Sequence, residues 1–210
     1  MQHSAESSRS GRYSPSNLWY YYKYYLLAAL FLILCILLAC FWRGGAEPQA
    51  YTALLLNAQP RSEDVSFPAD FAQAAGLGEE QGTPAFLTGF YMTQASAEGS
   101  MMTKQTIETR VASGELDSVL MQSQWFSVYE DVLFQDLRTC LSSDLLEKLA
   151  DRLYYVQPDT GEPYPIGIDV SGSAVLSQAY AYPDEPYWLG VCVNSEHSEL
   201  TEALIRYLFS

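Results

Sequence analysis

Residues 51–58 read YTALLLNA, and this stretch decides the fold of the chain. It is a short, continuous apolar run that closes with Asn57 and Pro60, which is typical of a strand buried on both faces. Residues 67–77 (FPADFAQAAGL) follow with apolar side chains at helical spacing. A second strand is predicted at 84–94 (PAFLTGFYMTQ), where alternate residues share one face. A buried strand, a helix and another strand in this order indicate an α/β fold.

The alternation of strands and helices continues along the chain. Residues 103–113 (TKQTIETRVAS) predict a helix that stops at a glycine, and 116–121 (LDSVLM) predict a third strand. A short helix is expected at 125–129, and residues 143–153 (SDLLEKLADRL) carry leucines at helical spacing. Because neighbouring parallel strands need a crossover connection, this order predicts a mainly parallel sheet with helices on both faces.

The last third of the chain has a different pattern. Two β-rich segments, 154–156 and 164–170, flank a turn-forming stretch and predict an antiparallel hairpin. A final strand is expected at 187–193 (YWLGVCV), and a final helix at 199–209. The predicted fold class is therefore α/β: a mainly parallel sheet plus an antiparallel hairpin, preceded by one transmembrane helix.

The transmembrane prediction rests on residues 24–42 (YYLLAALFLILCILLACFW), a run without charge. As a helix it would span roughly 28 Å, close to the hydrocarbon core of a bilayer. Three of the four basic residues around it, Arg9, Arg12 and Lys23, precede the run, which places the N-terminus in the cytoplasm. We expect a single-pass protein of the cell membrane, in contact with lipid through residues 24–42 and with its C-terminal domain outside.

Two alternatives to an uncleaved anchor stay open. The first is a cleaved signal peptide, which also begins with charge and an apolar stretch. The second is a bacterial lipoprotein signal, because residues 37–40 (LLAC) approximate a lipobox with Cys40 as the lipidated residue. In each case the same domain lies outside the membrane.

The domain organisation follows from these segments. We predict a cytoplasmic tail at 1–23, the transmembrane helix at 24–42, a linker at 43–50 and one extracytoplasmic α/β domain at 51–210. Of the 25 acidic residues only Glu6 precedes residue 44, whereas four of the 11 basic residues do. The remaining 24 acidic and 7 basic residues give the exported part a net charge of about −17, which excludes nucleic acid as a partner.

The sequence lacks the motifs of common enzymes. Its two histidines are His3 and His197, and the latter lies in a polar loop where a solvated helix-cap position is the simplest interpretation. No H-E-x-x-H, paired-cysteine, G-x-S-x-G or P-loop pattern occurs. We therefore predict no catalytic residues, no metal and no cofactor. Cys140 and Cys192 each lie among apolar residues, which favours two buried thiols and leaves a bridge open.

Several short segments resemble extracellular solute-binding proteins of ABC importers. The residues that carry the resemblance occur in order over about 110 residues, and they are 103–120, Phe134–Leu137 (FQDL), Tyr164–Gly167 (YPIG), 189–195 (LGVCVNS) and 202–208 (EALIRYL). Such proteins have two lobes that close on a ligand. Only residues 171–186 separate the hairpin from the last strand, so the resemblance implies a single lobe with the second one missing.

This resemblance implies a membrane-anchored, solute-binding-like module without catalytic activity that associates with a transporter. The alternative is a protein-interaction or sensory ectodomain that uses the same face. Open α/β sheets place ligands at the C-terminal ends of their strands. Asn57, Gln122, Trp125 and Tyr164 fall near such ends and are the predicted contacts for a ligand or partner, whose identity the sequence does not give.

Overall fold

The computed structural model describes residues 15–43, 49–158, 160–183 and 185–210. The chain divides into two units, Met1–Glu47 and Pro48–Ser210. Parts of the predicted tail (1–14) and of the predicted linker (44–48) lie outside the described residues.

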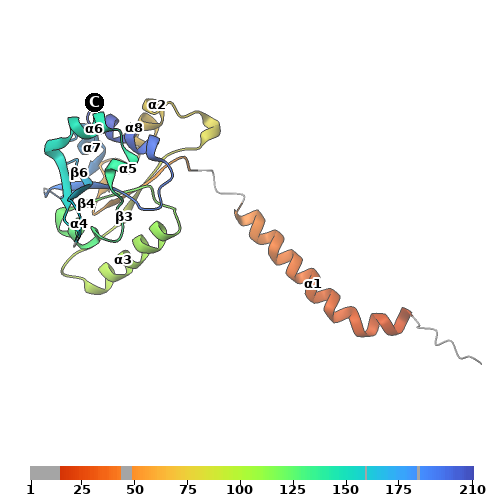
Figure 1. Ribbon diagram of the computed structural model, residues 1–210. Helices are drawn as coiled ribbons and strands as arrows, with labels where there is room; N and C mark the ends of the chain where they lie inside the picture. Colours follow the sequence, from red (N-terminus) through yellow and green to blue (C-terminus); the bar gives the residue numbers. More distant parts are fainter. Residues whose placement is uncertain (1–14, 44–48, 159, 184) are drawn as a thin grey trace, which may run out of the picture. The chain divides into compact units, whose positions relative to one another are not determined.

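The first unit contains helix α1 (Pro15–Arg43), drawn in orange in Figure 1. The predicted apolar run at 24–42 is therefore helical, and side chains are described for its residues up to 38. Among the described residues, no helix combines the length and the apolarity that crossing a membrane requires.

The second unit is built on a six-stranded sheet. From one edge to the other, its strands are β3 (Ala85–Phe90), β1 (Thr52–Leu56), β4 (Ser118–Gln122), β8 (Tyr187–Val191), β6 (Tyr164–Asp169) and β5 (Leu153–Val156). Strand β1 is parallel to both β3 and β4, as predicted. The other pairs, β4–β8, β8–β6 and β6–β5, are antiparallel.

The sheet is therefore mixed, and the prediction of a mainly parallel sheet was wrong. The physical reason lies in β8, which is central and buried almost throughout, as a parallel strand would be. Burial on both faces does not reveal strand direction. The predicted hairpin is confirmed as β5 and β6, whose register pairs Leu153 with Ile168.

Helices cover both faces of the sheet, which confirms the α/β class. Alternate residues of β1 point to opposite sides, so that Ala53 and Leu55 belong to one apolar cluster and Leu54 and Leu56 to the other. The helices of the first face are α2 (Phe67–Ala74), α5 (Leu137–Cys140), α6 (Ser143–Lys148), α7 (Ala174–Ala179) and α8 (Ser198–Leu208). The helices of the second face are α3 (Ala97–Ala112) and α4 (Ser123–Tyr129).

The predicted helices at 67–77, 125–129 and 199–209 are confirmed within a few residues. Helix α3 begins at Ala97, six residues before the predicted start at 103, and the short helices α5 and α7 were not predicted. The prediction of one helix at 143–153 was wrong. There α6 ends at Lys148, a 3₁₀ turn follows at Ala150–Arg152, and Leu153 already opens β5. The regular leucine spacing reflects burial of Leu145 and Leu149 in one cluster, which a broken helix achieves as well as a continuous one. Two further strands, β2 (Gln59–Pro60) and β7 (Tyr180–Ala181), form a separate antiparallel pair that the sequence did not predict.

Candidate functional site

The carboxyl ends of β1, β3, β4 and β6 all lie on the same side of the sheet, perpendicular to its outer strands. We call this side, where these four strands end, the carboxyl edge. Two of the predicted contact residues meet there. Nδ2 of Asn57 donates a hydrogen bond to Oε1 of Gln122 at 3.0 Å. Asn57 also bonds the backbone of Met92 twice, through Nδ2 to the carbonyl at 2.9 Å and through Oδ1 from the amide at 2.8 Å. The Asn57 side chain thus fastens the segment after β3 to the end of β1.

Asn57 has a backbone φ of 57°, in the left-handed region that side chains other than glycine seldom adopt. Asparagine tolerates this conformation better than most residues, because its short side chain forms local hydrogen bonds. The strained residue therefore lies where β1 leaves the sheet, at the edge where α/β proteins place ligands.

Gln122 is 1% exposed, and its Nε2 group has no hydrogen-bond partner among the described residues. The indole Nε1 of Trp125, three residues further along in α4, is also buried without a described partner. Buried amide and indole donors without a partner carry a desolvation cost of about 1–3 kcal/mol. These two donors are therefore places where an acceptor would be stabilising.

Tyr164 does not join this group. It opens β6, and since β6 runs in the same direction as β1 and β4, its first residue lies at the opposite edge. The predicted position of Tyr164 was wrong because the sequence did not reveal which end of the hairpin strand faces which edge. The Arg138 guanidinium lies 5.9 Å from the centre of its ring.

An open groove lies at the carboxyl edge, with a volume of about 470 Å³. The chain brings four separate segments to it: the end of β2, the end of β6, helix α7, and the loop before β8. Its described lining residues are Arg61, Asp169, Ser171, Ser177, Tyr180, Tyr182, Pro183, Glu185 and Pro186. We call this the carboxyl-edge groove.

Arg61 is held in the groove by the small β2–β7 pair. Its amide donates to the carbonyl of Ala179 at 3.0 Å, and its Nε donates to the carbonyl of Ser177 at 2.7 Å. Both acceptors lie in the last turns of α7, where backbone carbonyls lack helical partners. The two terminal nitrogens of the guanidinium have no described partner. They are therefore available to a ligand.

Asp169 and Tyr182 also line the groove. Oδ1 of Asp169 accepts hydrogen bonds from the amide of Ser171 at 2.9 Å and from its hydroxyl at 2.5 Å, which shapes the turn after β6. The ring of Tyr182 stacks on Tyr187 with centroids 4.6 Å apart, and its hydroxyl donates to the carbonyl of Ser171 at 3.3 Å. Burial raises the pKa of Tyr182, nearby Arg61 opposes the rise and Asp169 adds to it. Both charges therefore act on one hydroxyl.

The groove and the Asn57–Gln122 pair are connected. The hydroxyl of Tyr187, which is fully buried, donates to the carbonyl of Leu56 at 2.7 Å, immediately before Asn57. On the other side, Nε2 of Gln124 donates to Glu185 of the groove at 3.4 Å. These two contacts tie the end of β1 and the start of α4 to the residues at and just before the start of β8.

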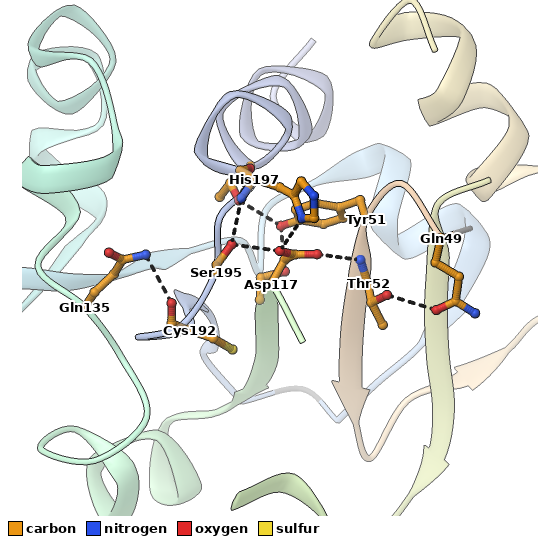
Figure 2. A network of polar contacts seen from close by, with 10 residues as sticks. Gln49, Tyr51, Thr52, Asp117, Gln135, Cys192, Ser195 and His197 are labelled. Atoms are coloured by element: carbon orange, nitrogen blue, oxygen red, sulfur yellow. Dashed lines mark hydrogen bonds and ion pairs between the residues drawn. The ribbon is translucent and has the colours of Figure 1, made fainter. Parts of the chain in front are cut away.

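A second polar cluster lies at the opposite edge, around Asp117 just before β4 (Figure 2). Oδ1 of Asp117 accepts from the hydroxyl of Ser195 at 2.8 Å and lies 2.8 Å from Nδ1 of His197. Oδ2 accepts from the amide of Thr52 at 2.8 Å. Figure 2 shows Ser195 and His197 converging on this carboxylate while Thr52 approaches it from β1.

This cluster contains Ser, His and Asp but does not have the arrangement of a hydrolase triad. In a triad the serine hydroxyl is bonded to the imidazole, which takes its proton. Here the Ser195 hydroxyl donates to Oδ1 of Asp117, and Nδ1 of His197 lies next to the same oxygen. The imidazole is therefore not positioned to take a proton from Ser195. His197 is the N-cap residue of α8, as predicted. Its contact with Asp117 was not predicted. The cluster holds the start of α8 against the sheet.

Among the described residues, no group of three His, Cys, Asp or Glu side chains is placed to hold a metal ion. Cys140 and Cys192 are free thiols. No family model, curated protein or solved structure matches this chain. The resemblance to a solute-binding lobe therefore stays a prediction from sequence segments.

Proposed function

We propose that the chain is a non-catalytic module that binds a polar solute in the carboxyl-edge groove and is held at a membrane by residues 24–42. The observation that carries the proposal is the position of the groove. Asp169, the last residue of β6, lines the groove, which therefore lies on the side of the sheet that serves as the ligand site of open α/β sheets, and its volume suits a small molecule. A membrane transporter is the expected recipient of the solute.

The surface of α1 supports attachment to the membrane. The described stretch of α1 exposes large apolar side chains all along its length, including Leu30 at 65%, Phe31 at 67% and Ile33 at 53%. Contiguous exposed apolar surface of this kind marks a site of contact with lipid or protein.

Attachment can be tested by fractionating cells that express the full chain. We expect the protein in the membrane pellet after alkaline carbonate extraction. Leu30→Asp combined with Ile33→Asp should move it toward the supernatant, because a charge in the hydrocarbon region costs about 2.5–3.5 kcal/mol. The matched control, Val128→Asp with Val132→Asp at exposed positions of the domain, should stay in the pellet. A supernatant location of the unmodified chain would contradict membrane attachment.

Solute binding can be tested by thermal shift of the full chain against amino acids, amines, carboxylates and sugars. A ligand in the groove should raise the melting temperature, since binding to the native state stabilises it. Tyr182→Ala, which removes one wall of the groove, should abolish the shift. If no compound stabilises the chain and a membrane complex co-purifies with it, solute binding is excluded.

A specific observation favours the second candidate, a protein-interaction ectodomain. Tyr91, directly after β3, is 45% exposed, and Met101 and Met102 near the start of α3 are 72% and 68% exposed. The Thr103 hydroxyl bonds the Tyr91 carbonyl at 3.0 Å, which holds these side chains near the carboxyl edge. Exposed methionine and tyrosine are common in surfaces that bind proteins. Binding of a membrane partner that Met101→Asp with Met102→Asp abolishes would support this function.

A further inference from the structure

Charges of both signs line the carboxyl-edge groove without pairing to each other. Arg61, Asp169 and Glu185 all contribute to its walls. Within the described part of the chain, none of the three takes part in an ion pair, and no N–O distance between them is within 4.0 Å. Because the cation and the carboxylates share one groove, a ligand with both charges would satisfy them together.

Arg61 differs from the other basic side chains of the domain. Four of those form ion pairs with described carboxylates: Lys104, Arg138, Lys148 and Arg206. Two others lie over aromatic rings, Arg110 over Phe90 and Arg152 over Phe209. The described polar partner of the Arg61 side chain is a backbone carbonyl. Among the described basic side chains of the domain, Arg61 is the one with neither an ion-paired carboxylate nor an aromatic ring beside its charged group. Its two terminal nitrogens fit a carboxylate in two-point geometry.

The acidic side of the groove also retains free acceptors. Oδ1 of Asp169 is used by the turn to Ser171, but no described donor reaches its Oδ2. Glu185 is exposed, and only its Oε2 has a described contact, the long one from Gln124. These free oxygens suit an ammonium group, which needs several acceptors.

We propose, on the basis of the solute-binding function above, that the ligand of the groove is a small zwitterion of the amino-acid type. Its carboxylate lies on Arg61, and its ammonium group lies on Asp169 and Glu185. The ring of Tyr182 lies against the carbon chain between the two charges. The neutral amide pair of Asn57 and Gln122 remains outside this contact.

A ladder of ω-amino acids tests the proposal, because its members differ only in the separation of the two charges. Glycine, 3-aminopropanoate, 4-aminobutanoate and 6-aminohexanoate are titrated against the full chain by saturation-transfer NMR and thermal shift. Butylamine and butyrate serve as singly charged controls. We expect one spacing to bind best and both controls to bind at least about tenfold more weakly, as loss of a charged hydrogen-bonded contact predicts.

Two conservative variants assign the charges. Arg61→Gln and Asp169→Asn should each weaken binding of the best zwitterion about tenfold or more, and Asp169→Asn keeps the Oδ1 acceptor of the local turn. Arg110→Gln and Asp131→Asn, at sites outside the groove, should leave the affinity within about twofold. Butylamine binding as tightly as the zwitterions, or a neutral sugar binding instead, would overturn the zwitterion while leaving solute binding intact. Absence of binding by every class of compound would overturn both.

Discussion

Nδ1 of His197 lies 2.8 Å from Oδ1 of Asp117, although the two residues are 80 positions apart and the imidazole is half-exposed while the carboxylate is nearly buried. The same carboxylate accepts hydrogen bonds from Thr52 in β1 and Ser195 in the loop before α8. One side chain therefore connects the start of two central strands to the start of the last helix.

Asp117→Ala should destabilise the domain by about 2–3 kcal/mol, because it leaves the buried Thr52 amide without its acceptor. His197→Ala should cost less than about 1 kcal/mol, since an exposed partner contributes little. Urea unfolding followed by circular dichroism measures both. The exposed Asp131→Ala is the matched control and should change stability by no more than about 0.5 kcal/mol. Equal losses for Asp117→Ala and Asp131→Ala would contradict the role of this carboxylate.

A second close relationship involves two glycines that face each other on neighbouring strands. Gly167 of β6 pairs with Gly190 of β8, and the rings of Phe126 and Phe134 stack over them with centroids 4.4 Å apart. A Cβ atom on Gly167 would come within 2.5 Å of Cζ of Phe126, and one on Gly190 would overlap the ring of Phe134. The missing side chains therefore make room for the aromatic pair.

Gly190→Ala should destabilise the domain by about 1–3 kcal/mol through overpacking. Combining it with Phe134→Leu should recover part of the loss, because the smaller side chain frees space at the same position. Gly172→Ala is the control, since its added Cβ would meet only the flexible end of Arg152, at 3.4 Å. If Gly190→Ala and Gly172→Ala had equal effects in urea unfolding, the packing explanation would be wrong.

The sequence predicted most elements of the domain because their signals are local. Strand β1 is apolar on both faces, and the sharp turn after α3 requires Gly114 at a φ of 72°. Strand direction is not local, because it depends on which strand pairs with which. The glycine pair under Phe126 and Phe134 was not predictable for the same reason: each glycine is explained by a ring from another segment.

The candidate site was predictable only in part. Asn57 and Gln122 could be found because each stands at the end of a buried strand. Arg61 and Tyr182 belong to the groove through the two-residue β2–β7 pair, which is too short to leave a periodic pattern. Asp169 is the last residue of β6. Like Asn57 it is a polar residue at the end of a buried strand, and this pattern would have predicted it as a site residue.

Asn57 allows backbone strain and side-chain bonding to be separated. Asn57→Gly removes the bonds to Met92 and Gln122 but suits the left-handed backbone. Asn57→Ala removes the same bonds and adds a strain of about 1–2 kcal/mol. We therefore expect both variants to be less stable than the unmodified chain, with alanine the worse by about 1 kcal/mol or more. Unfolding free energies from urea titration give the comparison, and an alanine variant as stable as the glycine variant would contradict strain at this position.

Glu202 of α8 predicts a specific acid sensitivity. Burial tends to raise its pKa, but hydrogen bonds from Arg206 and from the amide and hydroxyl of Ser142 outweigh it and hold the pKa below the ordinary value. A carboxylate with a lowered folded-state pKa stabilises the fold above its unfolded pKa of about 4.3, and this stabilisation is lost as the pH falls through the folded value. The stability gap between the unmodified chain and Glu202→Gln should therefore be largest near neutral pH and shrink below about pH 4. Glu199→Gln, an exposed position on the same helix, should show a gap that is small at every pH; a Glu202→Gln gap that grows in acid would contradict the argument.

The thiol of Cys140 determines how the orientation of the domain can be measured. Burial raises its pKa to about 11, with Asp136 adding to the rise, so that little thiolate exists at neutral pH. Cys140 should therefore react slowly with a maleimide even where the reagent reaches the domain.

Ser127→Cys places a thiol on an exposed position of α4, away from the groove. If the domain lies outside, a membrane-impermeant maleimide should label Ser127→Cys in intact cells and leave the unmodified chain nearly unlabelled. Denaturation in the presence of the reagent should then label the thiols of Cys140 and Cys192 as well, which shows that they are present and reduced. Labelling of Ser127→Cys only after lysis would place the domain on the cytoplasmic side and would overturn the proposed topology.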